Sequence, residues 1–387
     1  MGGEQEMVPS TTVAETAFQE TTGLKVLTVL PPRERFAPGE AGAISLLVQR
    51  MAGRGEVVVG LPPDGPPFAG ISFAPVQRVF RPFSRINRYA GGVARLVRRM
   101  KPDLLEIHNR PDVALALRKL CPTVPVVLVL HNDPCGMRQA RTPAEREKLG
   151  QVAAIVAVSE WVRSRFVSQD VKACVRVLPN SLDMATLPPS PVQRENRLLF
   201  AGRVVADKGA DAFVAACEQI LPKYPDWQAD MIGADRFGPD SPETPFLSGL
   251  RPKAQAAGVH LRGYQPHDVV LNAMAAAAIV VVPSRWPEPF GMSALEAMGC
   301  GAAVVASHKG SLPDVVGNTG LYADPDNLAE LVSVLECLIT DAPLRQAMGQ
   351  DARQRAWLFD NTLVREKRRL LHQDIVRQWR WKGTFQA

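Results

Sequence analysis

The sequence predicts an α/β protein of two domains, each a parallel β-sheet covered by helices on both faces. Three observations lead to this prediction. Short, continuously apolar runs alternate with longer helical patterns, which is typical of buried parallel strands with helical crossovers. A Pro-rich polar stretch, LPPSPVQREN at 187–196, divides the alternation into two similar halves. The chain has 387 residues, 46% of them hydrophobic, and is therefore long enough for two cores.

The strands are predicted from apolar runs too short for helices. They lie at 24–31, 55–62, 103–109, 124–132 and 153–159 in the first half and at 196–203, 227–233, 258–264, 277–284 and 301–307 in the second. Helical patterns lie between them, for example at 41–54 and 86–102. We expect a disordered lead over 1–22, an N-terminal domain over 23–187, a linker over 188–195, a C-terminal domain over 196–360, and a C-terminal helix over 361–387 that can cross back to the N-terminal domain. Ligands of such proteins bind outside the carboxyl ends of the strands, which predicts a cleft between the domains.

The composition indicates the kind of partner and the cellular compartment. The formal net charge is +6, which favours anionic partners but is equally compatible with a solubilising surface. Six cysteines are scattered without a C-x-x-C pair, which indicates a reducing compartment. The first residues lack the apolar core of a signal peptide, and no run approaches the roughly 18 apolar residues of a membrane span. These features predict a cytoplasmic protein.

Two common nucleotide motifs are missing. The single G-x-G, at Gly299 and Gly301, precedes a predicted strand, so it suits a helix C-terminus better than a pyrophosphate turn. No G-x-x-x-x-G-K-[ST] occurs. Hydride transfer and P-loop hydrolysis are therefore disfavoured.

Basic residues follow the first strand of the second half. In LLFAGRVVADKGAD, Gly202 and Arg203 leave the strand and Lys208 precedes the next helix. An arginine fork and a lysine ammonium near a helix N-terminus suit a diphosphate. Taken alone, the two cations are better interpreted as solvated loop charges.

The segment WPEPFGMSALEAMGCG at 286–301 also follows a predicted strand. Two prolines hold Glu288 in an extended loop, and Gly291 allows the backbone to approach a ligand closely. Glu296 lies in the second turn of the helix that begins there. The alternatives are a capping carboxylate for Glu288 and a dipole-stabilising surface acid for Glu296. The backbone N–H groups that open the helix are those of Gly291, Met292 and Ser293. Two acids beside a cationic subsite are typical of a sugar-nucleotide site.

These residues resemble retaining glycosyltransferases of the family 4 type, which have the GT-B fold of two Rossmann-like domains facing each other across a cleft. The family's E-x7-E motif is matched by Glu288 and Glu296, and its F-x-G-R…K-G element by FAGRVVADKG. GSLPDVVGNTGLYADPDNLAEL, AVSEW at 157–161 and LPNSLD at 178–183 also fit the family pattern. The match is strong in the C-terminal half and weak in the N-terminal half.

The resemblance implies roles for the matched residues. Arg203 and Lys208 would bind the donor diphosphate in place of a metal ion, so no metal or other cofactor is expected. Glu288 would contact the donor sugar and Glu296 the ribose. The remaining donor-binding positions implied are Gly202, Gly291, Met292, Ser293, and Gly263 with Tyr264 beside the base.

In the N-terminal half, His131 matches the family's histidine at the donor sugar, although a lone histidine at a strand end is more often structural. Gly42 resembles the family's glycine loop near the donor phosphates. The sequence departs here from the usual Gly-Gly pair, since Gly39 and Gly42 are separated. The implied reaction is metal-independent hexose transfer with retention, from GDP-mannose or a UDP-hexose to a saccharide or lipid-linked acceptor in bacterial lipopolysaccharide or exopolysaccharide synthesis.

Three other interpretations are compatible with parts of the sequence. DPD at 324–326 spells the D-x-D of metal-dependent transferases, but Asp326 or Asn327 suits a helix N-cap. A non-catalytic nucleotide-sugar-binding or scaffold protein on the same fold is the alternative to an enzyme. The basic stretch 78–101, with Arg81, Arg85, Arg88, Arg95, Arg98 and Arg99, lacks a nucleic-acid module, so no nucleic-acid partner is expected. It suits either a solvated helix or contact with an anionic membrane, which would make the protein peripheral at the inner membrane.

Overall fold

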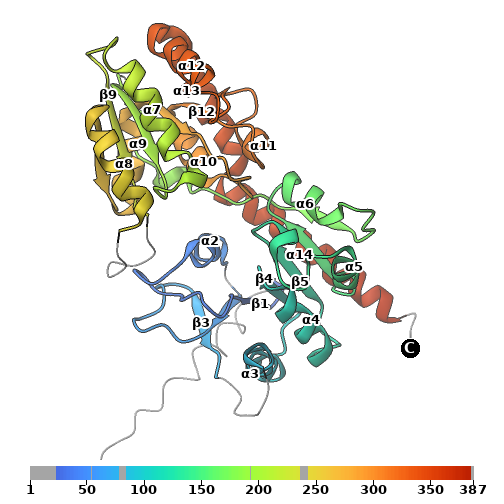
Figure 1. Cartoon of the computed structure of the whole chain (residues 1–387). Coiled ribbons are helices and arrows are strands. Elements are labelled where there is room, and N and C mark those ends of the chain that lie inside the picture. The colour runs from blue at the N-terminus through green and yellow to red at the C-terminus, as the bar shows by residue number, and fades with distance from the viewer. Residues whose placement is uncertain (1–22, 54, 78–83, 192, 236–242, 385–387) are drawn as a thin grey trace, which may run out of the picture. The chain divides into compact units, whose positions relative to one another are not determined.

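The computed structural model describes residues 23–53, 55–77, 84–191, 193–235 and 243–384. The chain divides into two compact units. Unit 1 takes the described residues up to Val158, then Val162–Pro179, and the C-terminal residues from Val364; unit 2 takes Ser159–Trp161 and Asn180–Leu363. Figure 1 lets the chain be followed from the blue strands of unit 1, through the yellow and orange elements of unit 2, to the red C-terminal helix.

Unit 1 is built on a seven-stranded sheet in the order β3-β2-β1-β4-β5-β6-β7, with every neighbouring pair parallel. All residues of the central strands β4 and β5 are buried, as expected when helices cover both faces of a sheet. The five strands predicted in this half are confirmed, while β3 and β7 were not predicted. The strands are β1 (Val26–Val29), β2 (Glu56–Gly60), β3 (Ser72–Pro75), β4 (Leu104–His108), β5 (Val126–Leu130), β6 (Ala154–Ala157) and β7 (Val175–Val177).

The helices of unit 1 carry recognisable start signals. Ser84 caps α3 through a hydrogen bond from Asn87 N, and Thr142 forms a capping box with Glu145 at the start of α5. The helices are α2 (Ala43–Met51), α3 (Arg85–Met100), α4 (Pro111–Leu120), α5 (Pro143–Leu149), most of α6 (Glu160–Val167) and, from Val364, α14 (Asn361–Thr384).

Helix α14 is anchored in unit 1 by buried charges. Arg368 contacts both carboxylate oxygens of Glu106 in β4 at 2.8–3.1 Å and also pairs with Glu56 at 2.7 Å. Burial acts to raise the pKa of Glu106, but the charges of Arg368 and His372 outweigh it and hold that pKa well below its ordinary value. A buried arginine needs such partners, so this contact fixes where α14 lies.

Unit 2 holds a six-stranded sheet in the order β10-β9-β8-β11-β12-β13, again parallel throughout. The chain runs outward from β8 to one edge and then returns to β11 on the other side of β8. The carboxyl ends of β8 and β11 therefore form the topological switch point, where α/β sheets bind their ligands. The strands are β8 (Glu195–Ala201), β9 (Gln228–Ile232), β10 (Val259–Gly263), β11 (Ala277–Val282), β12 (Ala303–Ala306) and β13 (Leu321–Tyr322).

The core of unit 2 joins these strands to flanking helices. Phe213 and Ile220 of α7, Leu250 of α8 and Leu335 of α12 pack in one buried cluster with the apolar residues of the strands. The five strands predicted in this half are confirmed, and the two-residue β13 was not predicted. The helices are α7 (Ala210–Ile220), α8 (Pro245–Ala256), α9 (His267–Ala276), α10 (Met292–Gly299), α11 (Leu312–Val316), α12 (Leu328–Thr340) and α13 (Ala342–Ala356).

The division between the units differs from the predicted linker at 188–195. The chain passes from unit 1 to unit 2 at Pro179–Asn180, so residues 188–195 belong to unit 2. Arg194 explains this placement, because its guanidinium donates to the carbonyl oxygens of Ala275 at 2.5 Å and Cys300 at 2.7 Å. A polar Pro-rich stretch is thus tied to the domain that it precedes. In the described part of the chain, no helix is both long and apolar enough to cross a membrane.

Candidate functional site: the ends of β8 and β11

The loops that leave β8 and β11 lie against each other because the two strands are neighbours in the sheet. The carbonyl oxygen of Asp207 accepts hydrogen bonds from the backbone N–H groups of Arg285 and Trp286 at 2.8 and 2.9 Å. The guanidinium of Arg285 pairs with Asp211 at 2.7 Å. A Cβ at Gly209, where φ is 71°, would lie 1.9 Å from the carbonyl oxygen of Pro283, so this approach requires glycine. The two loops thus form one structure.

Lys208 and Glu288 meet where these loops join. The Lys208 ammonium pairs with Glu288 Oε1, and the Ser284 hydroxyl donates to the same oxygen at 2.8 Å. Glu288 is only 8% exposed. A carboxylate so far removed from water needs the cation and the hydroxyl. The structure therefore brings together one acid and one cation that the sequence placed 80 residues apart.

The backbone of Glu288 is held as firmly as its side chain. Its carbonyl oxygen accepts from both the N–H (2.8 Å) and the hydroxyl (3.0 Å) of Ser311, and Glu288 forms a parallel bridge with Gly310. A Cβ at Gly310, where φ is 64°, would lie 2.3 Å from the Glu288 backbone. The loop after β12 therefore fixes the loop after β11.

Helix α10 begins directly after this loop. Its N-cap, Gly291, has φ 93°, and a Cβ there would lie 2.7 Å from Leu312 Cδ2. Met292 and Ser293 are the first two helical residues, so their N–H groups have no acceptor within the helix. These amides, with the helix dipole, favour an anion at this end.

Glu296 lies in the second turn of α10 and is held from a neighbouring helix. His267, the first residue of α9, places Nε2 2.9 Å from Glu296 Oε1. Glu296 is 9% exposed, whereas the His267 side chain is about half exposed. The alternative of a fully exposed acid is wrong for Glu296.

Other predicted donor-binding residues also lie at the carboxyl ends of strands in this sheet. Gly202 and Arg203 follow β8, and Arg203 is exposed. Gly263 ends β10 with φ 67°, and Tyr264 after it is 79% exposed. Since β10 is the edge strand, this pair lies two strands away from β8.

Of the D-x-D residues, Asp326 pairs with Arg285 at 2.5 Å, and the Asn327 side chain accepts from Glu330 N as the N-cap of α12. The predicted capping role is therefore confirmed for Asn327. No group of three or more potential metal-ligating side chains occurs among the residues that the structure describes.

His131 lies in unit 1, at the end of β5, and belongs to a chain of polar contacts that was not predicted. Its Nε2 lies 2.8 Å from His108 Nδ1, and His108 Nε2 lies 2.9 Å from Glu106 Oε1. The other Glu106 oxygen contacts His372 Nε2 at 2.6 Å. Burial, and then the nearby His108, lower the pKa of His131 to about 3. His131 is therefore neutral at physiological pH.

Gly42 is the N-cap of α2, as predicted, but the position is already occupied by a carboxylate. Glu34 Oε2 accepts from Ser45 N at 3.2 Å, and a Cβ at Gly42 would lie 2.6 Å from Glu34 Oε1. A phosphate at this helix end would have to compete with Glu34. The role of Gly42 in donor binding stays a prediction.

Sequence reasoning missed Ser284, His267, His108 and Glu106. The signal for Glu106 was an acid inside the apolar run DLLEIHN, since a carboxylate in a buried strand requires partners. For Ser284 and His267 the chain offered only their positions at a strand end and a helix start.

Both halves of the chain match family models of glycosyltransferases. Residues 44–186 match the family model "Glycosyltransferase Family 4" and residues 188–355 match "Glycosyl transferases group 1". The chain is 26% identical over 314 residues to a Bacillus subtilis (strain 168) protein named as a glycosyltransferase, YtcC, covering 75% of this chain and 77% of that one. It is 24% identical to the lipopolysaccharide 1,2-N-acetylglucosaminetransferase of Salmonella typhimurium, covering 71% and 75%.

Among solved structures, the Anabaena protein HepE, crystallised with UDP and glucose, superposes with a TM-score of 0.67 at 20% identity over 89% of this chain and 98% of that one. This likeness shows the fold. With two parallel-sheet α/β units that match glycosyltransferase family models one after the other, the chain is a glycosyltransferase of the GT-B fold.

Proposed function

We propose that this enzyme transfers a hexose from a nucleotide sugar to a saccharide or lipid-linked acceptor, with retention at the anomeric carbon and without a metal ion. The observation that supports this most directly is the contact of Lys208 with Glu288 at the switch point between β8 and β11. A cation for the diphosphate and an acid for the sugar then lie side by side. HepE, a structural neighbour of this chain, was crystallised with UDP and glucose, which also favours a nucleotide-sugar donor.

The chemistry follows from where charge develops. Breaking the sugar–phosphate bond leaves an oxocarbenium-like centre and a diphosphate that gains negative charge. Arg203, Lys208 and the amides at the start of α10 are suited to stabilise that charge. Fixed donors of this kind typically lower a barrier by about 3 kcal/mol each.

Lys208 has a second role in this proposal. The Lys208 ammonium neutralises Glu288, so binding of a diphosphate would draw Lys208 toward the phosphate and free the Glu288 carboxylate for the hydroxyls of the sugar. Ser284 keeps Glu288 in place during this exchange, since it donates to the same oxygen. His131 is the residue of unit 1 that the resemblance places at the donor sugar.

The decisive experiment is a thermal-stability screen with GDP-mannose, UDP-glucose, UDP-galactose and UDP-N-acetylglucosamine. A ligand that binds only the folded protein at about 100 times its Kd stabilises it by about 2.7 kcal/mol. Turnover of the stabilising donor then completes the test, and its persistence in excess chelator would establish metal independence. If none of the four donors stabilises the protein, the proposed donor class is wrong.

We further propose that the acceptor belongs to cell-envelope lipopolysaccharide or exopolysaccharide synthesis and that the enzyme works in the cytoplasm at the inner membrane. The relative from Salmonella typhimurium acts on lipopolysaccharide by its name, which favours this choice. The basic helix α3 supplies the membrane-facing surface in this proposal. Arg81 lies outside the described residues, whereas Arg85, Arg95, Arg98 and Arg99 of α3 are exposed and Arg88 is half-buried.

A further inference from the structure

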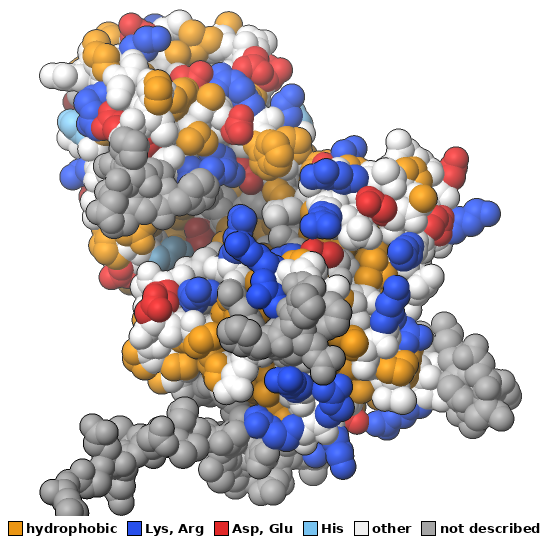
Figure 2. Space-filling model, turned by 60° about the horizontal axis from the view of Figure 1, so that its bottom comes forward, with side chains coloured by type: hydrophobic (Ala, Val, Ile, Leu, Met, Phe, Trp, Pro, Cys, Tyr) orange, Lys and Arg blue, Asp and Glu red, His pale blue; other side chains and the backbone are white. Residues whose placement is uncertain are grey.

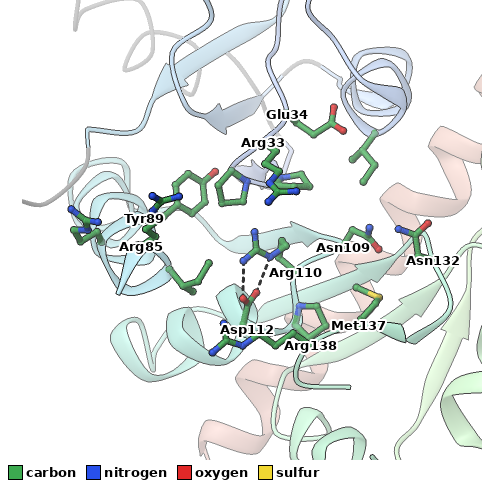
Figure 3. Close-up of a pocket in the computed structure, with 16 residues that line it drawn as sticks. Arg33, Glu34, Arg85, Tyr89, Asn109, Arg110, Asp112, Asn132, Met137 and Arg138 are labelled. Carbon is green, nitrogen blue, oxygen red and sulfur yellow. Dashed lines mark hydrogen bonds and ion pairs between the residues drawn. The ribbon is translucent and has the colours of Figure 1, made fainter. Parts of the chain in front are cut away.

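A pocket of about 740 Å³ opens in unit 1 where β1, β4 and β5 end. Such a volume lies in the usual range for small-molecule sites. Figure 3 shows Arg33 and Glu34 above the pocket, Arg110, Asp112 and Arg138 below it, and Arg85 with Tyr89 on the side opposite Asn109 and Asn132. Since the pocket lies at the carboxyl ends of parallel strands, it is placed where this kind of sheet binds ligands.

The lining of this pocket carries an excess of positive charge. Its two acids, Glu34 and Asp112, face five arginines. Asp112 is engaged by Arg110 in a two-pronged pair at 2.7 and 2.9 Å, and Glu34 accepts from Ser45 N. The arginines are Arg33, Arg85, Arg88, Arg110 and Arg138.

Most of these arginines lack a counter-ion. Within the described ranges, Arg33, Arg85, Arg88 and Arg138 show no ion pair with a carboxylate, and the buried Nε of Arg88 shows no hydrogen bond. Guanidinium groups stay charged at any physiological pH and match phosphate oxygens in a forked geometry. Figure 2 shows Lys and Arg side chains gathered in the lower part of the face turned to the viewer. An anion is the ligand that such a lining is suited to hold.

A second feature connects this pocket to the proposed chemistry. Asn109 lines the pocket, and its Oδ1 accepts a hydrogen bond from His131 N at 3.1 Å. The Asn109 amide nitrogen, and the side chain of Asn132 beside it, can hydrogen-bond hydroxyls. The pocket therefore places hydroxyl-binding groups close to His131 and phosphate-binding groups on the arginine side.

We propose that this pocket binds the acceptor and that the acceptor is a hydroxyl-rich ring carrying a phosphate ester. The arginines hold the phosphate, while Asn109 and Asn132 orient the ring toward His131. The assignment rests on the proposed transfer of a hexose and adds the chemical class of the second substrate. A free sugar phosphate and a lipid-linked sugar phosphate share this chemistry.

The test is calorimetric titration of the full chain with glucose 6-phosphate and, in parallel, glucose. We expect the phosphate to bind at least about tenfold more tightly, because it gains charge-assisted hydrogen bonds to guanidinium groups. Arg88→Gln and Arg138→Gln should each remove most of that preference. The matched control is Arg99→Gln, which makes the same change at an exposed residue of α3 that lines neither this pocket nor the one beside it. Arg203→Gln should leave the binding unchanged, which separates this pocket from the donor diphosphate subsite.

Two further measurements complete the test, namely vesicle binding and the screen of nucleotide-sugar donors. Phosphatidylcholine vesicles with and without phosphatidylinositol present the same class of headgroup on a lipid, and binding to the doped vesicles that Arg88→Gln abolishes would assign the phosphate to a lipid source. Equal affinity for glucose and glucose 6-phosphate, together with no preference for the doped vesicles, would overturn the assignment, as would equal losses in Arg88→Gln and Arg99→Gln. The donor screen separates the two proposals: if no nucleotide sugar binds but Arg88-dependent phosphate binding remains, the hexose transfer fails and the anionic site stands.

Discussion

Nε2 of His131 lies 2.8 Å from Nδ1 of His108, and Nδ1 of His131 is buried without a hydrogen-bond partner in the described structure. The ionised Glu106 accepts a hydrogen bond from His108 Nε2–H, which leaves His108 Nδ1 as an acceptor. His131 Nε2 must then carry the donated proton, so His131 Nδ1 presents a lone pair. The contacts thus fix the tautomer of His131 and leave its Nδ1 as a buried acceptor without a donor among the described residues.

The first prediction concerns His108 as a positioning residue. His108→Phe keeps an aromatic ring but removes both hydrogen bonds, so His131 loses the partner that sets its tautomer. We expect kcat to fall about tenfold, the value of one lost hydrogen bond, with little change in the KM of the donor. The ¹⁵N NMR shifts of His131 should at the same time show a mixture of tautomers.

His372→Gln is the matched control for this prediction. It changes the contact on the other oxygen of Glu106 and leaves the contact between His108 and His131 intact. An unchanged His131 tautomer in His108→Phe would show that the contacts from Glu106 through His108 do not orient the His131 ring.

A second prediction concerns stability at acidic pH. The folded-state pKa of His131 is about 3, whereas the ordinary value is about 6.5. Below about pH 6.5 the unfolded chain binds a proton that the folded protein does not, so the stability contribution is complete above that pH and is lost as the pH falls toward about 3. The expected slope is about 1.4 kcal/mol per pH unit.

Denaturant unfolding between about pH 5 and about pH 6.5 measures this slope, since in that window an ionised Glu106 adds little. His131→Gln should flatten the dependence. If wild type and variant show parallel curves, His131 does not remain neutral in the folded protein.

A third prediction separates the two cations of the proposed phosphate subsite. Arg203→Ala and Lys208→Ala should each lower turnover by about 100-fold at saturating donor, because each removes a cation from the leaving group. Their stabilities should differ. Arg203 is exposed, so its loss should change the free energy of unfolding by less than about 0.5 kcal/mol. Lys208→Ala leaves the buried Glu288 without its ammonium and should cost about 1–3 kcal/mol.

The double variant Lys208→Ala/Glu288→Gln checks the origin of that cost. Removing the negative charge as well should restore part of the stability, whereas a cost that persists in full would mean that Lys208 stabilises the loop by other contacts. Near-wild-type turnover of either single variant would refute the leaving-group role.

A fourth prediction distinguishes the roles of Glu288 and Glu296. Glu296→Gln should weaken binding of a bare nucleoside diphosphate about tenfold, because ribose contacts exist in every bound state. Glu288→Gln should spare that binding and depress transfer. His267→Asn should weaken binding in the same direction as Glu296→Gln, since His267 orients this carboxylate. Identical binding profiles for the Glu288 and Glu296 variants would remove this distinction.

The sequence predicted the central strands because they are continuously buried and rich in Val, Leu and Ile. It missed β3, β7 and β13, which lie at the edges of their sheets and are at most four residues long. Such short edge strands bury little surface, so no apolar run marks these three. The division between the units differs from the predicted linker for another reason: LPPSPVQREN has the composition of a linker, but Arg194 within it binds carbonyl oxygens of unit 2.

The candidate site was predictable where one strand end holds the motif. Glu288, Gly291 and Glu296 lie within nine residues of sequence, and the structure places them on one loop and helix. The contact between Lys208 and Glu288 followed only from the order of the strands. The chain of contacts from Glu106 through His108 to His131 depends on α14, because Arg368 of that helix pairs with Glu106. These two residues are 262 positions apart, and no local pattern reveals such a pairing.

The last prediction concerns membrane contact by α3. Arg95 and Arg98 are exposed on this helix and lie outside the pocket assigned to the acceptor phosphate. If α3 faces an anionic bilayer, each cation near the surface contributes about 1 kcal/mol, within a Debye length of about 8 Å at physiological salt. Wild-type protein should therefore bind phosphatidylglycerol vesicles at low salt and be released as salt rises. Arg95→Glu/Arg98→Glu should abolish this binding while glucose 6-phosphate still binds, because the charge reversal does not touch Arg88 or Arg138.

The matched control is Arg251→Glu, a reversal at an exposed arginine of unit 2, which should leave vesicle binding unchanged. Wild-type protein that ignores anionic vesicles at low salt would assign the arginines of α3 to a solvated surface.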